Sequence, residues 1–138
     1  MGMYGMTGRE KGTDYRSWGE AQLARFFESS GVSYFYEHPL ALVEGGKTRL
    51  WYPDFRLADN GILVEYCGMV GKPDYDAGVE KKRAAYRENG YAALMLTPDY
   101  FRGNWPQKLR GEIEGTLQGR LDSFRGLRSH GYDGRRRQ

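Results

Sequence analysis

The stretch Ile62-Leu63-Val64-Glu65-Tyr66-Cys67 is an almost continuous apolar run that contains one carboxylate. A strand that is covered on both faces reads in this way, so the run predicts a buried central strand of a sheet. Burying a lone carboxylate is costly, which makes Glu65 the residue of this strand that needs an explanation.

Upstream of this strand, the pattern predicts two further strands joined by short turns. Their aromatic and β-branched segments cover residues 32–38 with 40–43, and residues 48–52 with 55–57. Glu44-Gly45-Gly46-Lys47 and Ala58-Asp59-Asn60-Gly61 read as the turns. Short connections make the three strands an antiparallel meander.

Helices are predicted before and after the strands. Ser17-Trp18-Gly19-Glu20 fits a capping box, and Gly31 ends that first helix. A second helix over about 76–88 leads to a short strand over 91–96, which the crossover places parallel to the strand of Glu65. Apolar residues spaced by four and three mark one face of a final helix: Leu109, Ile113, Leu117, Leu121 and Phe124.

This order predicts the α/β (α+β) class, with an α-β-β-β-α-β core. We expect a mixed sheet of four to five strands flanked by helices, and a C-terminal helix. The 138 residues suit one domain, over 15–125, preceded by a flexible arm, 1–14, and followed by a basic, disordered tail, 126–138. Residues 120–138 carry a charge of +4 and leave −1 for the rest, as in a protein that meets a polyanion through its tail, although a solvated terminus explains the same charge.

Several protein classes are excluded by composition. No apolar run approaches the ~18 residues that a membrane span requires, and the first residues lack the basic and apolar regions of a signal peptide. One cysteine and two histidines make a poor structural zinc site. The sequence therefore predicts a cytoplasmic protein with no membrane partner.

Asp54 and Glu65 are the first candidate site. Asp54 ends one side of a predicted hairpin, and Glu65 lies in the neighbouring strand, where antiparallel strands are ~5 Å apart. Two converging carboxylates repel and need a cation, and oxygen ligands favour Mg²⁺ or Mn²⁺. The alternative is structural: Asp54 caps a turn, and Glu65 pairs with an arginine.

Glu20 and Lys82 extend this candidate site. Glu20 lies on the helical face that packs on the sheet, and is either the capping partner of Ser17 alone or a third acid of the site. Lys82 shares a face with Val79 and Tyr86, which directs an ammonium at the sheet, whereas Lys81 is turned about 100° away. A lysine whose stem lies along apolar surface is the structural alternative for Lys82.

Taken together, four pieces of this chain resemble the PD-(D/E)XK nuclease superfamily, the restriction-endonuclease-like fold. They are Ser17–Glu20, Tyr52-Pro53-Asp54-Phe55, Val64–Gly68 and Glu80–Tyr86, in the order and on the elements of that family's core. The branch that they resemble reads "PDF…IEYWG…K…Y" and is found alone or attached to DNA helicases. The resemblance covers about residues 17–98.

The resemblance implies a role for each matching residue. Asp54, Glu65 and the backbone carbonyl of Tyr66 would bind Mg²⁺ or Mn²⁺, and Glu20 matches an acid that some branches carry on the first helix. The common lysine position, two residues after the second acid, is Cys67 here. Lys82, four residues before Tyr86, matches the lysine of the resembling branch, and Lys72 is the weaker substitute.

The function expected from this resemblance is Mg²⁺-dependent hydrolysis of DNA phosphodiester bonds by an endonuclease that leaves 5′-phosphate and 3′-OH ends. The residues expected to contact nucleic acid are basic: Lys72, Arg83, Arg135, Arg136 and Arg137. Nothing in the sequence separates DNA from RNA. A duplex cutter needs two active sites, which suggests a homodimer, and a helicase or another DNA-processing protein is a candidate partner.

Two other functions remain open. One is an inactive nucleic-acid-binding module with a degenerate nuclease fold, which would bind DNA without Mg²⁺. The other is a structural domain in which Arg49, Arg56 and Arg83 satisfy the acids.

Overall fold

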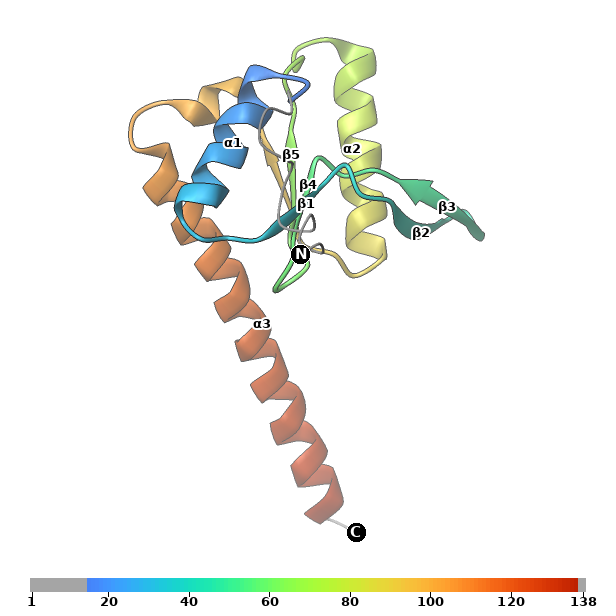
Figure 1. The fold of residues 1–138 in the computed structure, drawn as a ribbon. Coiled ribbons are helices and arrows are strands. Elements are labelled where there is room, and N and C mark those ends of the chain that lie inside the picture. The colour runs from blue at the N-terminus through green and yellow to red at the C-terminus, as the bar shows by residue number, and fades with distance from the viewer. Residues whose placement is uncertain (1–14, 137–138) are drawn as a thin grey trace, which may run out of the picture. The chain divides into compact units, whose positions relative to one another are not determined.

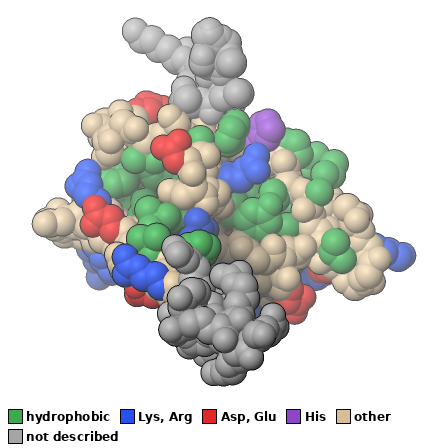
Figure 2. Space-filling model, turned by 90° about the horizontal axis from the view of Figure 1, so that it is seen from below, with side chains coloured by type: hydrophobic (Ala, Val, Ile, Leu, Met, Phe, Trp, Pro, Cys, Tyr) green, Lys and Arg blue, Asp and Glu red, His purple; other side chains and the backbone are tan. Residues whose placement is uncertain are grey.

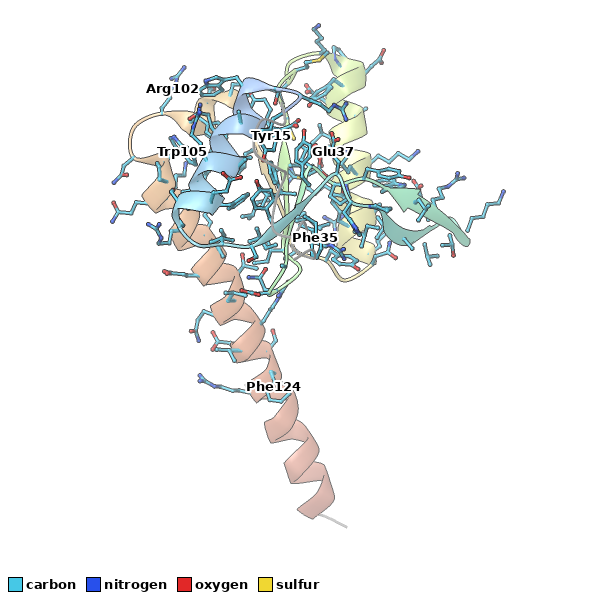
Figure 3. The ribbon with its side chains drawn as sticks, viewed as in Figure 1. Tyr15, Phe35, Glu37, Arg102, Trp105 and Phe124 are labelled. Carbon is cyan, nitrogen blue, oxygen red and sulfur yellow. The ribbon has the colours of Figure 1, made fainter. Side chains whose placement is uncertain are left out.

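The computed structural model describes residues 15–136, with side chains described as far as residue 126, and the expected arm, 1–14, lies outside this range. The chain divides into two compact units, Met1–Arg102 and Gly103–Gln138. Figure 3 labels Arg102, where the first unit ends, and Trp105, where the long helix of the second begins.

The first unit is built on a mixed four-stranded sheet with the strand order β1-β4-β5-β6 (Figure 1). Its strands are β1 (Tyr34–Tyr36), β4 (Phe55–Leu57), β5 (Leu63–Tyr66) and β6 (Ala93–Leu96). The first three pair antiparallel, and β6 runs parallel to β5. The predicted α/β class, meander and parallel last strand are confirmed.

Two helices cover opposite faces of this sheet (Figure 1). On one face, Phe27 of α1 (Trp18–Ser29) packs its ring against Tyr34 and Phe55, at centroid distances of 5.4 and 5.3 Å. On the other face, Ala85 and Tyr86 of α2 (Pro73–Glu88) form a buried cluster with Leu63. The central strand β5 is therefore buried between the two helices, as its apolar run predicts.

Two strands that the sequence predicts as continuous, 32–43 and 48–57, are each broken in two in the structure. β2 (Leu40–Glu44) and β3 (Lys47–Trp51) form a separate two-stranded sheet. The break before β2 contains Pro39 and Glu37, whose φ is 52°, and the break after β3 contains Pro53, which cannot donate a ladder hydrogen bond. Gly45 and Gly46, with φ of 60° and 79°, form the tight turn between β2 and β3.

Helix and strand boundaries differ from the predictions by a few residues. α2 begins at Pro73 rather than near residue 76, because proline has no N–H to lose at the first helical position. β6 begins at Ala93 rather than residue 91. The irregular stretch after it contains a short 3₁₀ helix, η2 (Pro98–Phe101).

The second unit contains α3 (Trp105–Arg136). The sequence predicts a domain that ends at residue 125 and a disordered tail from 126, whereas the backbone stays helical to Arg136 and the division between the units falls after Arg102. A helix satisfies its own backbone hydrogen bonds, so the helical backbone continues where Leu121 and Phe124 are exposed. In the described part of the chain, no helix combines the length and apolar character needed to cross a bilayer.

Candidate active site

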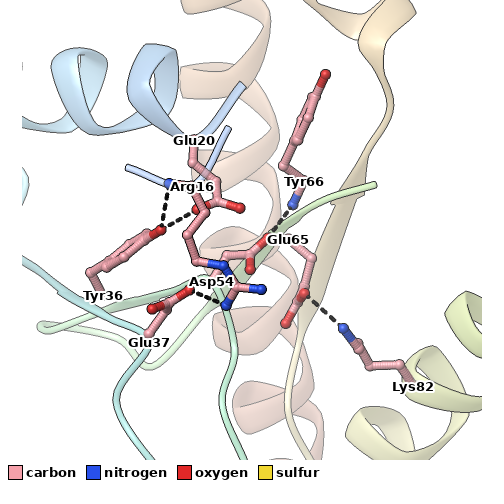
Figure 4. A network of polar contacts seen from close by, with 8 residues as sticks. All are labelled: Arg16, Glu20, Tyr36, Glu37, Asp54, Glu65, Tyr66 and Lys82. Carbon is pink, nitrogen blue, oxygen red and sulfur yellow. Dashed lines mark hydrogen bonds and ion pairs between the residues drawn. The ribbon is translucent and has the colours of Figure 1, made fainter. Parts of the chain in front are cut away.

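The structure brings Asp54 and Glu65 together through the register of β4 and β5. Phe55 pairs with Val64, so the preceding residue, Asp54, lies opposite Glu65. Side chains alternate between the faces of a sheet, which places both carboxylates on the face that α2 covers. The Tyr66 N–H donates to Asp54 Oδ2 at 2.7 Å and fixes the first acid beside the second (Figure 4).

Glu65 is held by two side chains of α2. Lys82 Nζ lies 3.2 Å from Glu65 Oε1, and the Tyr86 hydroxyl donates to Glu65 Oε2 at 2.6 Å. Glu65 is only 2% exposed, so its hydrogen bonds and its ion pair replace the water that it loses on folding. The predicted placement of Lys82 against the sheet is confirmed, whereas Lys81 is exposed and lies 3.6 Å from Glu44.

Burial raises the pKa of Asp54 to about 7, and the negative charges of Glu65 and Glu20 add to this shift. The Tyr66 N–H and the Lys82 ammonium act in the opposite direction. Two acids share one nearby ammonium, so the negative charge of Asp54 is poorly compensated and the side chain keeps its proton up to about pH 7. A cation placed between them would remove that charge imbalance.

The pKa of Lys82 is raised, although burial alone would lower it. The charge of Glu65 and the hydrogen bond to it outweigh the cost of burial, and the charge of Asp54 adds to them. Lys82 therefore carries its positive charge throughout the neutral range. The pKa of Tyr86 is raised by burial and by Glu65, so its hydroxyl stays protonated and remains a donor.

Glu20 lies near the acid pair on α1, the helix on the other face of the sheet. Ser17 Oγ accepts the Glu20 N–H at 3.1 Å, which is half of the predicted capping box. The Glu20 carboxylate itself accepts a hydrogen bond from the Tyr36 hydroxyl (Figure 4). Since its charge also raises the pKa of Asp54, Glu20 belongs to the surroundings of the acid pair and is more than a helix cap.

The residues of the acid pair fit a hard divalent cation. Within the described part of the chain, Asp54 Oδ1 accepts no hydrogen bond, and each Glu65 oxygen has a second lone pair. In an extended strand the N–H and C=O of one residue point to the same side, so the Tyr66 carbonyl faces the β4 side, as its N–H does. Two carboxylates and a carbonyl are oxygen ligands that suit Mg²⁺.

The described residues provide no cluster of three or more His, Cys, Asp or Glu side chains placed to hold one ion. Glu20, engaged by Tyr36, is thus not brought to the acid pair as a third ligand. The ligands available to a cation are those of Asp54, Glu65 and the Tyr66 carbonyl. Such a set leaves positions for water and a phosphate oxygen, as Mg²⁺ sites commonly do.

The arginines of the structural alternative have other partners. Arg49 lies 3.4 Å from Glu44, and Arg83 lies 3.5 Å from Glu80. Arg56 stacks over the Phe35 ring at 5.0 Å. In the described residues, Asp54 and Glu65 are thus not neutralised by these arginines, and Lys82 is the cation at the pair.

The described residues predicted to contact nucleic acid belong to two elements, α2 with its N-cap and α3. Arg83 lines a cavity of about 320 Å³ that Cys67 and Thr97 also line. Lys72 is exposed at the start of α2. Arg135 and Arg136 end α3, but their side chains and all of Arg137 lie outside the described residues.

Cys67 is buried beside this site but supplies no charge. Burial raises the pKa of its thiol to about 11, and the charge of Glu65 adds to the shift. At neutral pH the side chain is a neutral thiol, which is a poor nucleophile and a poor ligand. The side chain at position 67 is therefore inert, and the ammonium beside Glu65 is that of Lys82 on α2.

Sequence reasoning missed three residues that build the site. Tyr86 shares the face of Lys82 in the sequence pattern, and a tyrosine on that face is a natural donor to a buried acid such as Glu65. Tyr36, the partner of Glu20, has no signal beyond its position in a strand. The sequence pattern shows Gly19 only as part of a cap, whereas in the structure it makes room for the Tyr66 ring.

Gly19 carries a prediction of its own. A Cβ built on Gly19 would overlap the Tyr66 ring, which also packs against Phe101 at 5.7 Å. Gly19→Ala should therefore lower the free energy of unfolding by roughly 1–3 kcal/mol, the usual cost of overpacking, despite the higher helix propensity of alanine. Chemical denaturation measures this, with Gly78→Ala in α2 as the control because no atom lies within 4 Å of its Cβ. Equal stability of the two variants would contradict the close approach of α1 to Tyr66.

The geometry thus groups four charged residues at one end of β5. Asp54 and Glu65 form the pair, Lys82 neutralises part of its charge, and Glu20 lies next to it (Figure 4). This grouping rests on the chain's own contacts. Compared with family models, curated proteins and solved structures, the chain gives no significant match.

Proposed function

We propose that this protein is a metal-dependent nuclease that hydrolyses DNA phosphodiester bonds. The observation that carries the proposal is the buried Asp54–Glu65 pair with the Lys82 ammonium 3.2 Å from Glu65. A pair of acids that needs a cation, beside a lysine that keeps its charge, is suited to binding a metal and a phosphate together. The resemblance of the Tyr52–Phe55, Val64–Gly68 and Glu80–Tyr86 pieces to PD-(D/E)XK nucleases supports the same reading.

In this proposal Asp54, Glu65 and the Tyr66 carbonyl hold Mg²⁺ or Mn²⁺. When bound, the metal supplies a Lewis acid that lowers the pKa of a water and stabilises the leaving oxygen. Lys82 orients the attacking water and offsets charge that develops on the phosphate oxygens. The water oxygen bonds to phosphorus as the bond to the 3′ oxygen breaks; the attacking water releases one proton to solvent, and the 3′ oxygen takes one from solvent. The products are a 5′-phosphate and a 3′-OH.

Incubation with DNA tests the proposal directly. Supercoiled, linear and branched DNA are each mixed with the full chain in Mg²⁺, in Mn²⁺ and in EDTA, and the products are separated on gels. We expect cleavage with either metal and none in EDTA, because without a cation the two carboxylates repel the negatively charged phosphate. Cleavage that continues in EDTA, or none with either metal on any substrate, would contradict a metal-dependent nuclease.

The second candidate function is a nucleic-acid-binding module without catalysis. It is favoured by one observation: both oxygens of Glu65 already have protein partners, Lys82 and Tyr86. If these contacts are permanent, they stabilise the fold and leave Glu65 unavailable to a metal. The same incubation separates the two functions, since a binding module shifts DNA in EDTA and does not cut it in Mg²⁺.

A further inference from the structure

A cleft with a basic lining lies between the β2–β3 hairpin and α2. It has a volume of about 560 Å³ and is lined by Glu44, Gly45, Lys47, Arg49, Trp51 and Lys81. We call these six residues the basic cleft. The hairpin projects past α2 (Figure 1), and Lys and Arg side chains reach the edge of the view on that side (Figure 2).

The strand register explains why these side chains share the cleft. Leu42 pairs with Arg49 and Glu44 pairs with Lys47, so Lys47 and Arg49 lie on the same face of the hairpin as the buried Leu42. That face packs on α2 near Tyr86 and extends beyond it toward the turn at Gly45. Apolar side chains fill the part under the helix, and cationic ones line the part that continues past it.

The charges of the basic cleft are only partly compensated. Glu44 lies 3.4 Å from Arg49 Nε and 3.6 Å from Lys81 Nζ, so one carboxylate serves two cations. The side chains of Arg49 and Lys81 remain 55% and 71% exposed, and Lys47 is exposed as well. Three cations and one acid leave the cleft with a net charge of +2, available to an anion that enters from solvent.

The hairpin is fixed to α2, so the cleft has a defined position relative to the acid pair. Asn89, which caps α2, accepts the Val43 N–H at 2.9 Å and donates to the Val43 carbonyl at 3.0 Å. Trp51 packs its ring on Tyr86 at 5.7 Å, and the Tyr86 hydroxyl bonds to Glu65. Trp51 also precedes Asp54 by three residues, which limits their separation to about 11 Å of extended chain.

We propose that the basic cleft binds the phosphate backbone of a nucleic acid and leads that strand to Asp54 and Glu65. Lys47, Arg49 and Lys81 contact successive phosphates without reading bases, because they are exposed cations on a rigid support. Trp51 lines the cleft and is its residue closest in sequence to Asp54, and its aromatic side chain can offer a face to a nucleotide. This proposal rests on the proposed nuclease function for the role of the acid pair, but the binding itself requires neither metal nor cleavage.

The test compares two double variants of the full chain that each lose two positive charges. Lys47→Ala with Arg49→Ala alters the basic cleft, and Arg25→Ala with Arg102→Ala is the control, since both of its arginines are exposed and lie outside the cleft. Binding of a fluorescein-labelled duplex and of a single strand is measured by anisotropy in EDTA over a range of salt. We expect the cleft variant to bind about tenfold more weakly at low salt, with a salt slope flatter by up to about two counterions.

Glu44→Gln provides a test of the opposite sign. It removes the acid that partly neutralises Arg49 and Lys81, so DNA affinity should rise by several-fold. A structural role for the Glu44 ion pairs predicts no gain in affinity. Wild-type affinity in Glu44→Gln, or equal losses in the cleft and control variants, would overturn the proposal.

Binding of polyglutamate, at a length matched in charge to the DNA, identifies the class of partner. Polyglutamate that binds as tightly as DNA would overturn the assignment to nucleic acid and point to an acidic protein. The two proposals also fail separately. If the cleft variant binds DNA more weakly but the wild type does not cleave it, the binding role of the basic cleft stands and the nuclease function fails. If the cleft variant binds and cleaves DNA normally, the nuclease function stands and the binding role of the basic cleft fails.

Discussion

Asp54→Asn should abolish metal-dependent DNA cleavage, with a loss of about 10²–10³-fold or more in rate. The asparagine keeps an oxygen that accepts the Tyr66 N–H, which Asp54 accepts at 2.7 Å, so the backbone at the end of β5 stays in place. It removes the negative charge that a divalent cation needs from this position. Glu65→Gln should have the same effect, and single-turnover cleavage in Mg²⁺ measures both.

Asp54→Asn should also make the protein more stable in EDTA. The pH dependence of this gain should show that it comes from the Asp54 proton. Folding raises the pKa of Asp54 from 3.8 to about 7. The folded state therefore binds its proton more tightly, and the wild type loses stability as the pH rises from about 4 to 7. Asp54→Asn has no such proton to lose, so it should be more stable than wild type by roughly 1–3 kcal/mol at pH 8 and by little at pH 4.

Chemical denaturation at pH 4 and pH 8, with and without Mg²⁺, separates the possibilities. Mg²⁺ should stabilise the wild type at pH 8 and leave Asp54→Asn unchanged, since a ligand stabilises only the state that binds it. Asp59→Asn is the matched control, because Asp59 is exposed in the turn before β5. An active Asp54→Asn variant, or equal stabilisation of this variant and the wild type by Mg²⁺, would contradict the assignment of Asp54 as a metal ligand.

The element order could be predicted because it is encoded in local patterns. The apolar run of β5, the Gly45–Gly46 turn before β3 and the Gly61 turn after β4 can each be recognised from neighbouring residues alone. The separation of the β2–β3 hairpin could not be predicted in this way. It depends on Glu37 adopting a φ of 52° and on Leu42 packing against α2 rather than in the main sheet, and both are tertiary effects.

The same distinction applies to the candidate site. Asp54 and Glu65 are joined by a short turn, so register alone places them opposite each other, and helical spacing alone directs Lys82 toward β5. The bond from Tyr36 to Glu20 joins β1 to α1, and no local pattern relates those two side chains. The basic cleft was missed for a similar reason: its cations become neighbours only when the hairpin docks on α2.

Lys82→Ala should reduce the rate of cleavage by about 10²-fold, the loss expected for one contact that stabilises the transition state. Lys82 is the cation at the acid pair, with its Nζ 3.2 Å from Glu65, and its raised pKa keeps it charged. Lys82→Arg, which retains the charge, should recover part of the rate. Lys81→Ala, on the exposed side of the helix, should raise KM and leave kcat near the wild-type value, because Lys81 faces the basic cleft.

The position of the charge is tested by returning it to the strand. Cys67→Ala should be nearly silent, because the raised thiol pKa of about 11 leaves a neutral side chain at pH 7. Cys67→Lys combined with Lys82→Ala puts an ammonium at the position where the resemblance to PD-(D/E)XK nucleases implies a lysine, on the same face of β5 as Glu65. Recovered cleavage would show that the site needs a positive charge near the phosphate, whichever element supplies it.

Denaturation midpoints separate loss of fold from loss of chemistry, since removing Lys82 leaves a buried Glu65 without its cation. An inactive Cys67→Ala variant together with an active Lys82→Ala variant would reassign the chemistry from the lysine to the cysteine.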